Sequence, residues 1–254
     1  MAPRSVGPGI GVSEDGGVRY LHFDSPWVQG AMRLRRPFAL ELEYQRQMMA
    51  PLLFVPRPRR IVQLGLGAGA LTKFCWRHLP QARVTVVERW PSVVAVARRW
   101  FRLPPDDARL AVVEADAREF VFEPAYRGRA DWLQIDLYDA AARGPVYDDP
   151  GFYRACRNVL RPHGVAVVNL FGSALGSSLR ALAAGFPHGT LPLPETRSGN
   201  RVVLAFADSE AATRTADLQA AAAGVRARFG LDAAQWLSAS PAPRPGGRPR
   251  RLRR

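Results

Sequence analysis

Three alternating glycines and one acidic residue are the parts of this sequence best suited to chemistry. Gly65, Gly67 and Gly69 interrupt an apolar run that begins at Ile61, and a second apolar run ends in Glu88, 19 residues after the last glycine. Glycine has no Cβ, so the backbone can turn sharply off a buried strand and approach a ligand. A carboxylate at the end of the neighbouring strand can accept hydrogen bonds from two ribose hydroxyls. The spacing predicts a nucleoside-binding pocket.

Further acidic residues follow the next two predicted strands. Asp116 and Ala117 follow the third strand, whereas Asp136 and Asp139 follow the fourth. Because the carboxyl ends of parallel strands meet at one edge of a sheet, we expect these residues to face the same crevice as the glycines. Asp116 could accept a hydrogen bond from adenine N6, and the pair Asp136 and Asp139 suits a cationic ligand or a general base. Taken alone, Asp139 is better explained as a turn or helix-capping residue, but Asp136 closes an apolar strand and needs a partner there.

The chain alternates apolar runs of strand length with amphipathic stretches of helical period. Strands are expected near residues 60–64, 84–88, 110–114, 132–136 and 165–170, with helices between them. Residues 190–193 and 201–206 flank a turn-rich segment, which predicts an antiparallel hairpin at the edge of the sheet. The pattern is typical of an α/β fold with a doubly wound, mostly parallel, seven-stranded Rossmann-like sheet.

Four segments are expected along the chain. Residues 1–17 are rich in glycine, proline and charge and are expected to be disordered. Residues 18–50 would form a small module in which a strand pair leads to a helix around residues 42–53. Residues 51–238 would form the Rossmann-like domain that holds the nucleoside. Residues 239–254 are rich in arginine and proline and cannot build a core, so a disordered tail is expected.

The basic charge is concentrated at the carboxyl terminus. Six arginines lie in residues 241–254, so the formal charge of +14 falls to +8 for the other 240 residues. We therefore expect nucleic-acid contact to be limited to non-specific binding by the tail. No apolar run is long enough to cross a membrane, no secretory signal is recognisable, and Cys75 and Cys156 are isolated thiols without metal-binding spacing. A cytoplasmic protein without a metal is expected.

From about residue 21 to residue 208 the sequence resembles the spermidine synthase, or polyamine aminopropyltransferase, family. The segments that carry the resemblance are Trp27-Val28-Gln29, Leu42-Glu43-Tyr44, the glycine loop, Val87-Glu88, Asp116, Asp136 with Asp139, Gly144-Pro145, Phe152-Tyr153 and Pro194-Glu195-Thr196-Arg197. In that family a decarboxylated S-adenosylmethionine donates an aminopropyl group to an amine during polyamine biosynthesis. The resemblance implies a fold of the class I S-adenosylmethionine-dependent transferase type and a homodimer.

The resemblance also implies a role for each matching position. Glu88 would hold the donor ribose and Asp116 the adenine. Asp136 would take a proton from the attacking amine, while Asp139 and Tyr44 would position that amine. An alkyl amine has a pKa of about 10.4, so it is protonated at neutral pH and must lose a proton before its nitrogen can attack carbon. The other expected donor contacts are Gln29, Gly65, Gly67, Gly69 and Ala117.

The sequence departs from the family pattern at several positions. Ala68 stands where the glycine loop usually has an aspartate that binds an amine. Gln45 and Arg46 replace a histidine and a glutamate after Tyr44, which puts positive charge near the expected amine site. Only a short segment precedes Gln29, so the amino-terminal β-domain is expected to be truncated. The resemblance is stronger for the nucleoside half of the site than for the acceptor half.

Four functions remain compatible with the sequence. Aminopropyl transfer leads, supported by Asp136, Asp139 and Tyr44. Methyl transfer from ordinary S-adenosylmethionine on the same fold is second, because Ala68 and Arg46 would suit a donor that keeps its carboxylate. A nicotinamide-dependent dehydrogenase is third, since the glycine loop also fits the dinucleotide fingerprint Gly-x-Gly-x-x-Gly/Ala. A non-catalytic protein that binds a nucleoside or a polyamine is the fourth.

Overall fold

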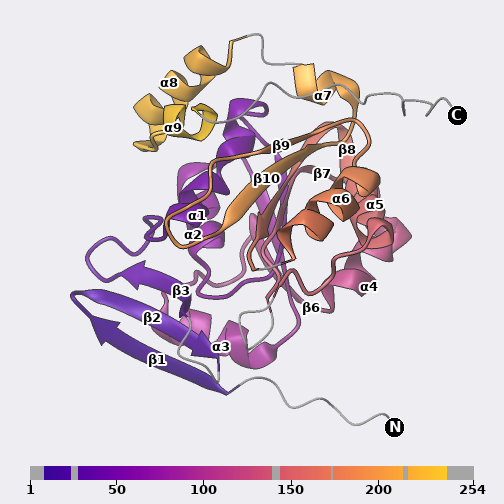
Figure 1. The fold of residues 1–254 in the computed structure, drawn as a ribbon. Coiled ribbons are helices and arrows are strands. Elements are labelled where there is room, and N and C mark those ends of the chain that lie inside the picture. The colour runs from indigo at the N-terminus through magenta and orange to yellow at the C-terminus, as the bar shows by residue number, and fades with distance from the viewer. Residues whose placement is uncertain (1–8, 24–27, 139–143, 173, 214–216, 239–254) are drawn as a thin grey trace, which may run out of the picture.

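A seven-stranded sheet forms the centre of the computed structural model, which describes residues 9–23, 28–138, 144–172, 174–213 and 217–238 (Figure 1). Its strands lie in the order β6 (Leu110–Glu114), β5 (Arg83–Glu88), β4 (Arg60–Leu64), β7 (Ala130–Ile135), β8 (Leu160–Leu170), β10 (Arg201–Phe206) and β9 (Thr190–Pro192). The five neighbouring strands β6, β5, β4, β7 and β8 run parallel to one another. Strand β10 pairs antiparallel with both β8 and β9. The predicted α/β fold, with its edge hairpin, is confirmed.

Helices cover both faces of this sheet. The helical elements are α1 (Glu43–Gln47), η1 (Ala50–Leu53), α2 (Ala70–His78), α3 (Pro91–Trp100), α4 (Ala117–Phe122), η2 (Pro124–Tyr126), α5 (Pro150–Val159), α6 (Leu175–Gly185), α7 (Ser209–Thr213), α8 (Leu218–Phe229) and α9 (Ala234–Leu237). Side chains of η1, α2, α3 and α8 pack into one core, and those of α4, α5 and α6 pack into the other. Strand residues alternate between the cores, as Ile61 and Val62 do in β4, because successive side chains of a strand point to opposite faces.

The amino-terminal module is a separate three-stranded antiparallel sheet, in the order β1 (Ile10–Asp15), β2 (Val18–Phe23) and β3 (Val28–Arg33). The predicted disordered segment 1–17 is therefore wrong for residues 10–15, which pair in full register with β2. Most of β1 is exposed, so its sequence carries no apolar alternation, and backbone hydrogen bonds hold it in place. The sheet rests on α3 through a cluster that includes Leu21, Phe23, Val93 and Phe101.

The helix expected around residues 42–53 is divided into α1 and η1. Pro51 lies in the first turn of η1 and has no N–H to donate, so it cannot continue the hydrogen-bonding pattern of α1. Met48, Met49 and the residues of η1 pack into the core of the large sheet rather than into the small one. This packing brings α1 to the sheet edge on which the predicted site residues lie.

The predictions on membrane spans, cysteines and metal sites can be compared with the described residues. Within these residues no helix is long and apolar enough to cross a membrane. Cys75 and Cys156 are free, buried thiols, as expected. In the same part of the chain, His, Cys, Asp and Glu form no group of three or more that could hold a metal ion. The expected disordered tail, residues 239–254, lies outside the described residues.

Candidate active site

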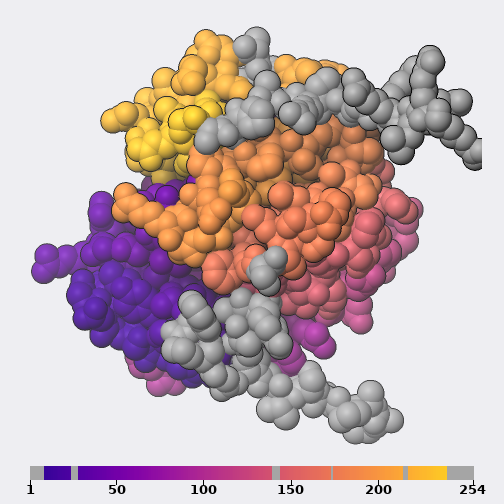
Figure 2. All heavy atoms as spheres, viewed as in Figure 1, coloured from indigo at the N-terminus to yellow at the C-terminus, as the bar shows by residue number. Residues whose placement is uncertain are grey.

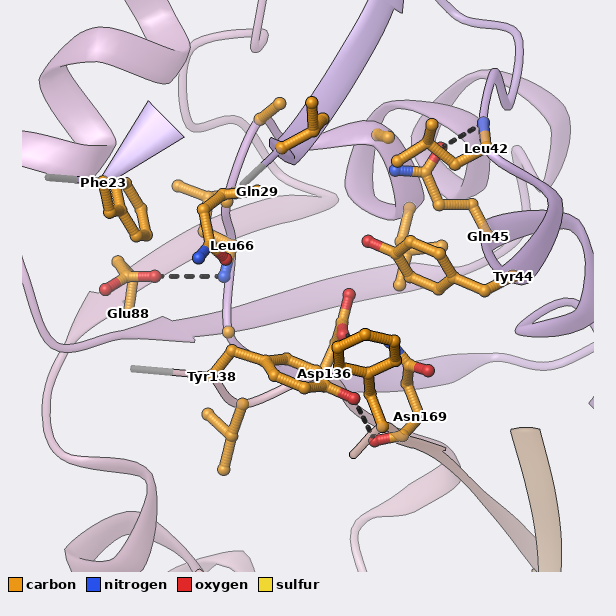
Figure 3. A pocket seen from close by; sticks show the side chains of 18 of the residues that line it. Phe23, Gln29, Leu42, Tyr44, Gln45, Leu66, Glu88, Asp136, Tyr138 and Asn169 are labelled. Atoms are coloured by element: carbon orange, nitrogen blue, oxygen red, sulfur yellow. Dashed lines mark hydrogen bonds between the residues drawn. The ribbon is translucent and has the colours of Figure 1, made fainter. Parts of the chain in front are cut away.

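A cavity of about 940 Å³ opens where the central strands end and the amino-terminal module begins. Figure 3 shows Gln29, Leu66 and Glu88 on one side of it and Tyr44 and Asp136 on the other. The predicted site residues that line the cavity are Gln29, Tyr44, Gly65, Gly67, Glu88, Asp116, Ala117 and Asp136. Asp139 lies outside the described residues.

The glycine loop connects β4 to α2 in a conformation that favours glycine. Gly65, Gly67 and Gly69 have φ angles of 92°, 51° and 67°, all in the left-handed region. A Cβ on Gly65 would lie 2.3 Å from the backbone oxygen of Asp136, so the loop packs directly against the end of β7. Gly69 was expected to contact the donor, but it starts α2 and faces Leu103 instead of lining the cavity. Its glycine is explained by helix geometry and packing.

Glu88 ends β5 with a buried carboxylate that already holds the loop in place. Its Oε2 accepts a hydrogen bond from the backbone N–H of Leu66 (3.1 Å), and its Oε1 accepts one from Trp90 (2.9 Å). Burial raises the pKa of Glu88, and hydrogen bonds from backbone N–H groups oppose this rise. Each carboxylate oxygen has a second lone pair, so the group can still accept hydrogen bonds from two hydroxyls in the cavity.

Both carboxylate oxygens of Asp116 already have polar partners within the protein. Its Oδ1 caps α4 by accepting from the backbone N–H of Arg118 (2.7 Å), and its Oδ2 accepts from the Tyr147 hydroxyl (2.6 Å). The Arg89 guanidinium lies 3.4 Å from the same Oδ2. An adenine amine at Asp116 would have to share the carboxylate with Tyr147 or replace it. Ala117, the first residue of α4, lies beside it in the cavity wall.

Asp136 directly follows β7 at the opposite side of the cavity. Its Oδ1 accepts a hydrogen bond from the side-chain amide of Asn169 (2.9 Å). Burial raises the pKa of Asp136, whereas this hydrogen bond and the interaction with the Tyr44 hydroxyl lower it. Burial also raises the pKa of Tyr44, and the Asp136 charge adds to that rise. Asp136 therefore has the properties of a half-buried base with two polar neighbours.

The departures from the family pattern can now be placed. The Arg46 guanidinium donates to the backbone oxygens of Leu40 (3.1 Å) and Glu41 (2.8 Å), and Arg46 does not line the cavity. It holds a loop and adds no cation to the cavity wall, so the inference drawn from its charge is wrong. Ala68 packs beneath β3, because a Cβ on Gly30 would lie 2.5 Å from the Ala68 Cβ. Ala68 also lines the cavity, where it presents a methyl group and no carboxylate.

Sequence comparison decides the family. The chain is 33% identical over 233 residues to the polyamine aminopropyltransferase of Chromobacterium violaceum, covering 91% of this chain and 88% of that relative. The chain belongs to the polyamine aminopropyltransferase family. No protein-family model matches the sequence.

Solved structures show the same fold. A probable spermidine synthase from Corynebacterium glutamicum superimposes with a TM-score of 0.67 at 23% identity, covering 85% of this chain and 84% of that one. Human methyltransferase-like protein 13, solved in complex with SAH, superimposes with a TM-score of 0.56 at 27% identity, covering 65% of this chain and 82% of the human one. Aminopropyltransferases and methyltransferases thus share the fold of this transferase.

Several polar residues of this aminopropyltransferase site were not expected from the sequence. Tyr147 and Arg89 contact Asp116, and the Tyr138 hydroxyl donates to the backbone oxygen of Asn169 (2.9 Å). Asn169 is a polar residue near the end of an otherwise apolar strand, and that signal could have identified it. The others are positioned by loops whose course the sequence does not specify.

Proposed function

We propose that this protein transfers an aminopropyl group from decarboxylated S-adenosylmethionine to an amine acceptor. The observation that carries the proposal is the half-buried Asp136 carboxylate, which lies in the same cavity as Glu88 and the glycine loop. A nucleoside-binding half and a proton-accepting half then meet in one space. Membership of the polyamine aminopropyltransferase family supports this reading of the two halves.

The donor half is formed by β3, the glycine loop and the ends of β5 and β6. Glu88 accepts hydrogen bonds from the ribose hydroxyls, and Asp116 and Ala117 lie against the purine. Gln29 and the backbone of Gly65 and Gly67 complete the wall. The donor sulfonium is already activated, so alignment of the amine for in-line displacement supplies much of the catalysis.

The acceptor half is formed around Asp136 and Tyr44. A protonated amine enters beside the Asp136 carboxylate, which accepts its proton and frees the nitrogen lone pair. The nitrogen attacks the propyl carbon next to sulfur, the carbon–sulfur bond breaks, and the electron pair of that bond leaves with the neutral thioether. Asp139, which follows Asp136 in the sequence, is proposed to help position the amine.

A product assay tests the proposal. The protein is incubated with labelled decarboxylated S-adenosylmethionine, or with labelled S-adenosylmethionine, and with a panel of diamines and polyamines. We expect label in an aminopropylated amine only with the decarboxylated donor, together with release of methylthioadenosine. Methylated product with the other donor, and none with the decarboxylated one, would overturn the proposal.

A matched pair of variants tests the donor half separately. Glu88 and Glu114 are register partners on β5 and β6, but Glu88 is buried in the cavity wall and Glu114 is exposed outside it. Glu88→Gln loses charged hydrogen bonds to the ribose and is expected to weaken methylthioadenosine binding at least tenfold by calorimetry. Glu114→Gln should bind as the wild type does. Equal affinities in the two variants would place the nucleoside elsewhere.

Methyl transfer is the second candidate, and one observation favours it. Ala68 supplies no carboxylate to the cavity wall where the family commonly has one, which removes a contact for a cationic aminopropyl chain. The likeness to a methyltransferase fold is compatible with this reading. The assay with the two donors distinguishes the candidates directly.

The setting of the enzyme is part of the proposal. We place it in the cytoplasm, which accords with two free cysteines. We propose a homodimer and a small-molecule amine acceptor, with nucleic-acid contact limited to non-specific binding by residues 239–254. Light scattering at micromolar concentration tests the dimer: the mass of a single chain would refute it.

A further inference from the structure

The turn between β9 and β10 is held to the active site from two sides. In Figure 2 the orange atoms of the β9–β10 region lie against the violet atoms of the amino-terminal part of the chain. On one side it meets α1: the backbone N–H of Arg197 donates to Glu43 Oε2 (3.0 Å), and the Gln47 amide donates to the backbone oxygen of Pro194 (2.9 Å). On the other side the Asn200 amide donates to Asn169 Oδ1 (3.1 Å). The turn thus contacts both the helix that carries Tyr44 and the strand beside Asp136.

Two asparagines connect this turn to Asp136. The Ser198 hydroxyl donates to Asn200 Oδ1 (2.7 Å), Asn200 Nδ2 donates to Asn169 Oδ1 (3.1 Å), and Asn169 Nδ2 donates to Asp136 Oδ1 (2.9 Å). Strand register explains the alignment, because Asn169 pairs with Val202 and Asn200 lies two residues earlier on the same face. Asn169 is only 2% exposed, so water has little access to compete with these bonds.

Every hydrogen bond in this chain of bonds is donated toward Asp136, and the carboxylate at its end fixes that order. An ionised carboxylate can only accept, so Asn169 must turn its NH₂ toward Asp136 and its oxygen toward Asn200. Asn200 must then present its own NH₂ to Asn169, which leaves its oxygen to accept from the Ser198 hydroxyl. If Asn200 cannot donate, the Asn169 oxygen loses its partner, and only the bond to Asp136 still orients the amide.

We propose that Asn169 and Asn200 are positioning residues that form a one-way amide relay from the hairpin turn to Asp136, fixing this base in its proton-accepting orientation. The inference rests on the proposed function for the role of Asp136 as the base. Arg197, Ser198, Asn169 and Asn200 also line the cavity, so an acceptor amine that contacts the turn contacts the relay as well. The relay therefore couples the place where the acceptor binds to the group that deprotonates it.

Two substitutions of Asn200 test the relay. Asn200→Asp keeps the shape but can no longer donate, and Asn200→Leu removes the donor without adding charge. In both variants the Asn169 oxygen loses its donor, so the amide is oriented less firmly and its hydrogen bond to the charged form of Asp136 is weakened. The pKa of Asp136 should rise by on the order of one pH unit, and by more in Asn200→Asp because of the added negative charge.

The control loosens the same turn without touching the relay. Gln47→Leu removes the bond to Pro194 but leaves Ser198, Asn200 and Asn169 intact. A purely structural role for the turn predicts that Gln47→Leu and Asn200→Leu behave alike. The relay predicts that only the Asn200 variants change the titration of Asp136.

The titration is followed by NMR of protein labelled with ¹³C at aspartate carboxyl groups, and the Asp136 signal is assigned by its absence in Asp136→Asn. Where product forms, the acidic limb of kcat/KM against pH is expected to shift by the same amount. Coincident titrations in the wild type and both Asn200 variants would overturn the relay. Because NMR needs no turnover, a failure of aminopropyl transfer would refute the proposed function and leave this measurement intact.

Discussion

Asp136 combines burial with hydrogen-bond donors, and at the scale of single residues this combination suits a base. Burial raises the pKa of its carboxyl, so the carboxylate holds a proton more strongly than an exposed aspartate does. Asn169 and Tyr44 donate hydrogen bonds that favour the charged form and oppose that rise. A base needs both properties, because it must be deprotonated before the reaction and attractive to a proton during it.

Asp136→Asn is therefore expected to separate chemistry from donor binding. The substitution preserves shape but removes the proton acceptor, so kcat should fall by at least about 100-fold. Methylthioadenosine affinity should stay within about threefold, because Glu88 and the glycine loop are unchanged. Steady-state kinetics and calorimetry measure the two effects. A variant that keeps more than a tenth of the wild-type kcat would exclude Asp136 as the base.

The pH dependence of the wild type has a defined sign. Protonated Asp136 cannot accept a proton, so kcat/KM should fall as pH decreases through its pKa. Because burial raises that pKa above the ordinary value of 3.8, the acidic limb should lie above pH 3.8. A rate profile recorded with saturating donor tests this. An activity that stays constant down to pH 3.8 in a folded protein would contradict it.

At the residue scale, the sequence predicts which residues belong to the site more readily than it predicts where their side chains point. Glu88 and Asp136 could be placed in one cavity because each ends an apolar strand, and strand ends meet at one sheet edge. Arg46 and Gly69 fitted the site by residue type but do not line the cavity, because the directions of their side chains and backbone depend on the packing of the loops that hold them. Asn169 was overlooked, although a polar residue in an apolar strand is a visible signal.

At the scale of elements, the contact between β3 and the glycine loop joins the small sheet to the donor site. Gly30 on β3 faces Ala68 of the loop so closely that any side chain at position 30 would collide with it. The apolar runs of the large sheet predicted its strands because they are local signals. The small sheet was only partly predicted, since β1 depends on pairing with β2 rather than on a pattern of its own.

Gly30→Ala should thus disturb both stability and donor binding. Its Cβ would lie 2.5 Å from the Ala68 Cβ and 3.1 Å from the Ala68 nitrogen. We expect a loss of about 1 to 3 kcal/mol in the free energy of unfolding and weaker methylthioadenosine binding. Gly11→Ala in β1 is the matched control, because its Cβ would meet only the His22 Cβ at 3.7 Å. Equal behaviour of the two variants in denaturant unfolding would refute a tight contact.

Helix packing gives a second comparison between glycines. Gly185 ends α6 against α5, where an added Cβ would lie 2.4 Å from the Tyr153 Cβ, whereas Gly224 in α8 has nothing within 4 Å of that position. Gly185→Ala should destabilise the protein by about 1 to 3 kcal/mol. Gly224→Ala should stabilise it by about 0.5 to 1 kcal/mol, because alanine favours a helix over glycine. Thermal unfolding that shows the same sign for both variants would contradict this account of the α5–α6 contact.

At the scale of the whole molecule, one buried lysine makes folding depend on pH. Lys73 is the single lysine of the chain, it is 1% exposed, and its Nζ donates to the backbone oxygen of Phe101 (2.6 Å). Burial, with a smaller effect of the Arg102 charge, lowers the pKa of Lys73 from 10.5 to about 7. The unfolded chain therefore binds a proton that the folded protein releases between these two values.

The sign of the linkage follows from that difference. Between about pH 7 and 10.5 the unfolded state binds more protons at Lys73, so stability from this group rises with pH, by up to about 1.4 kcal/mol per pH unit. Lys73→Met keeps a long apolar side chain and removes the titration. Free energies of unfolding are measured in urea from pH 7 to 9.5. The free energy of unfolding of the wild type should increase relative to that of Lys73→Met as pH increases. Both proteins retain the same buried tyrosines and cysteines. Subtracting one free energy of unfolding from the other therefore largely removes the contribution of those groups to the pH dependence. Two parallel curves would show that Lys73 titrates alike in the folded and unfolded chain, and would contradict a buried neutral amine.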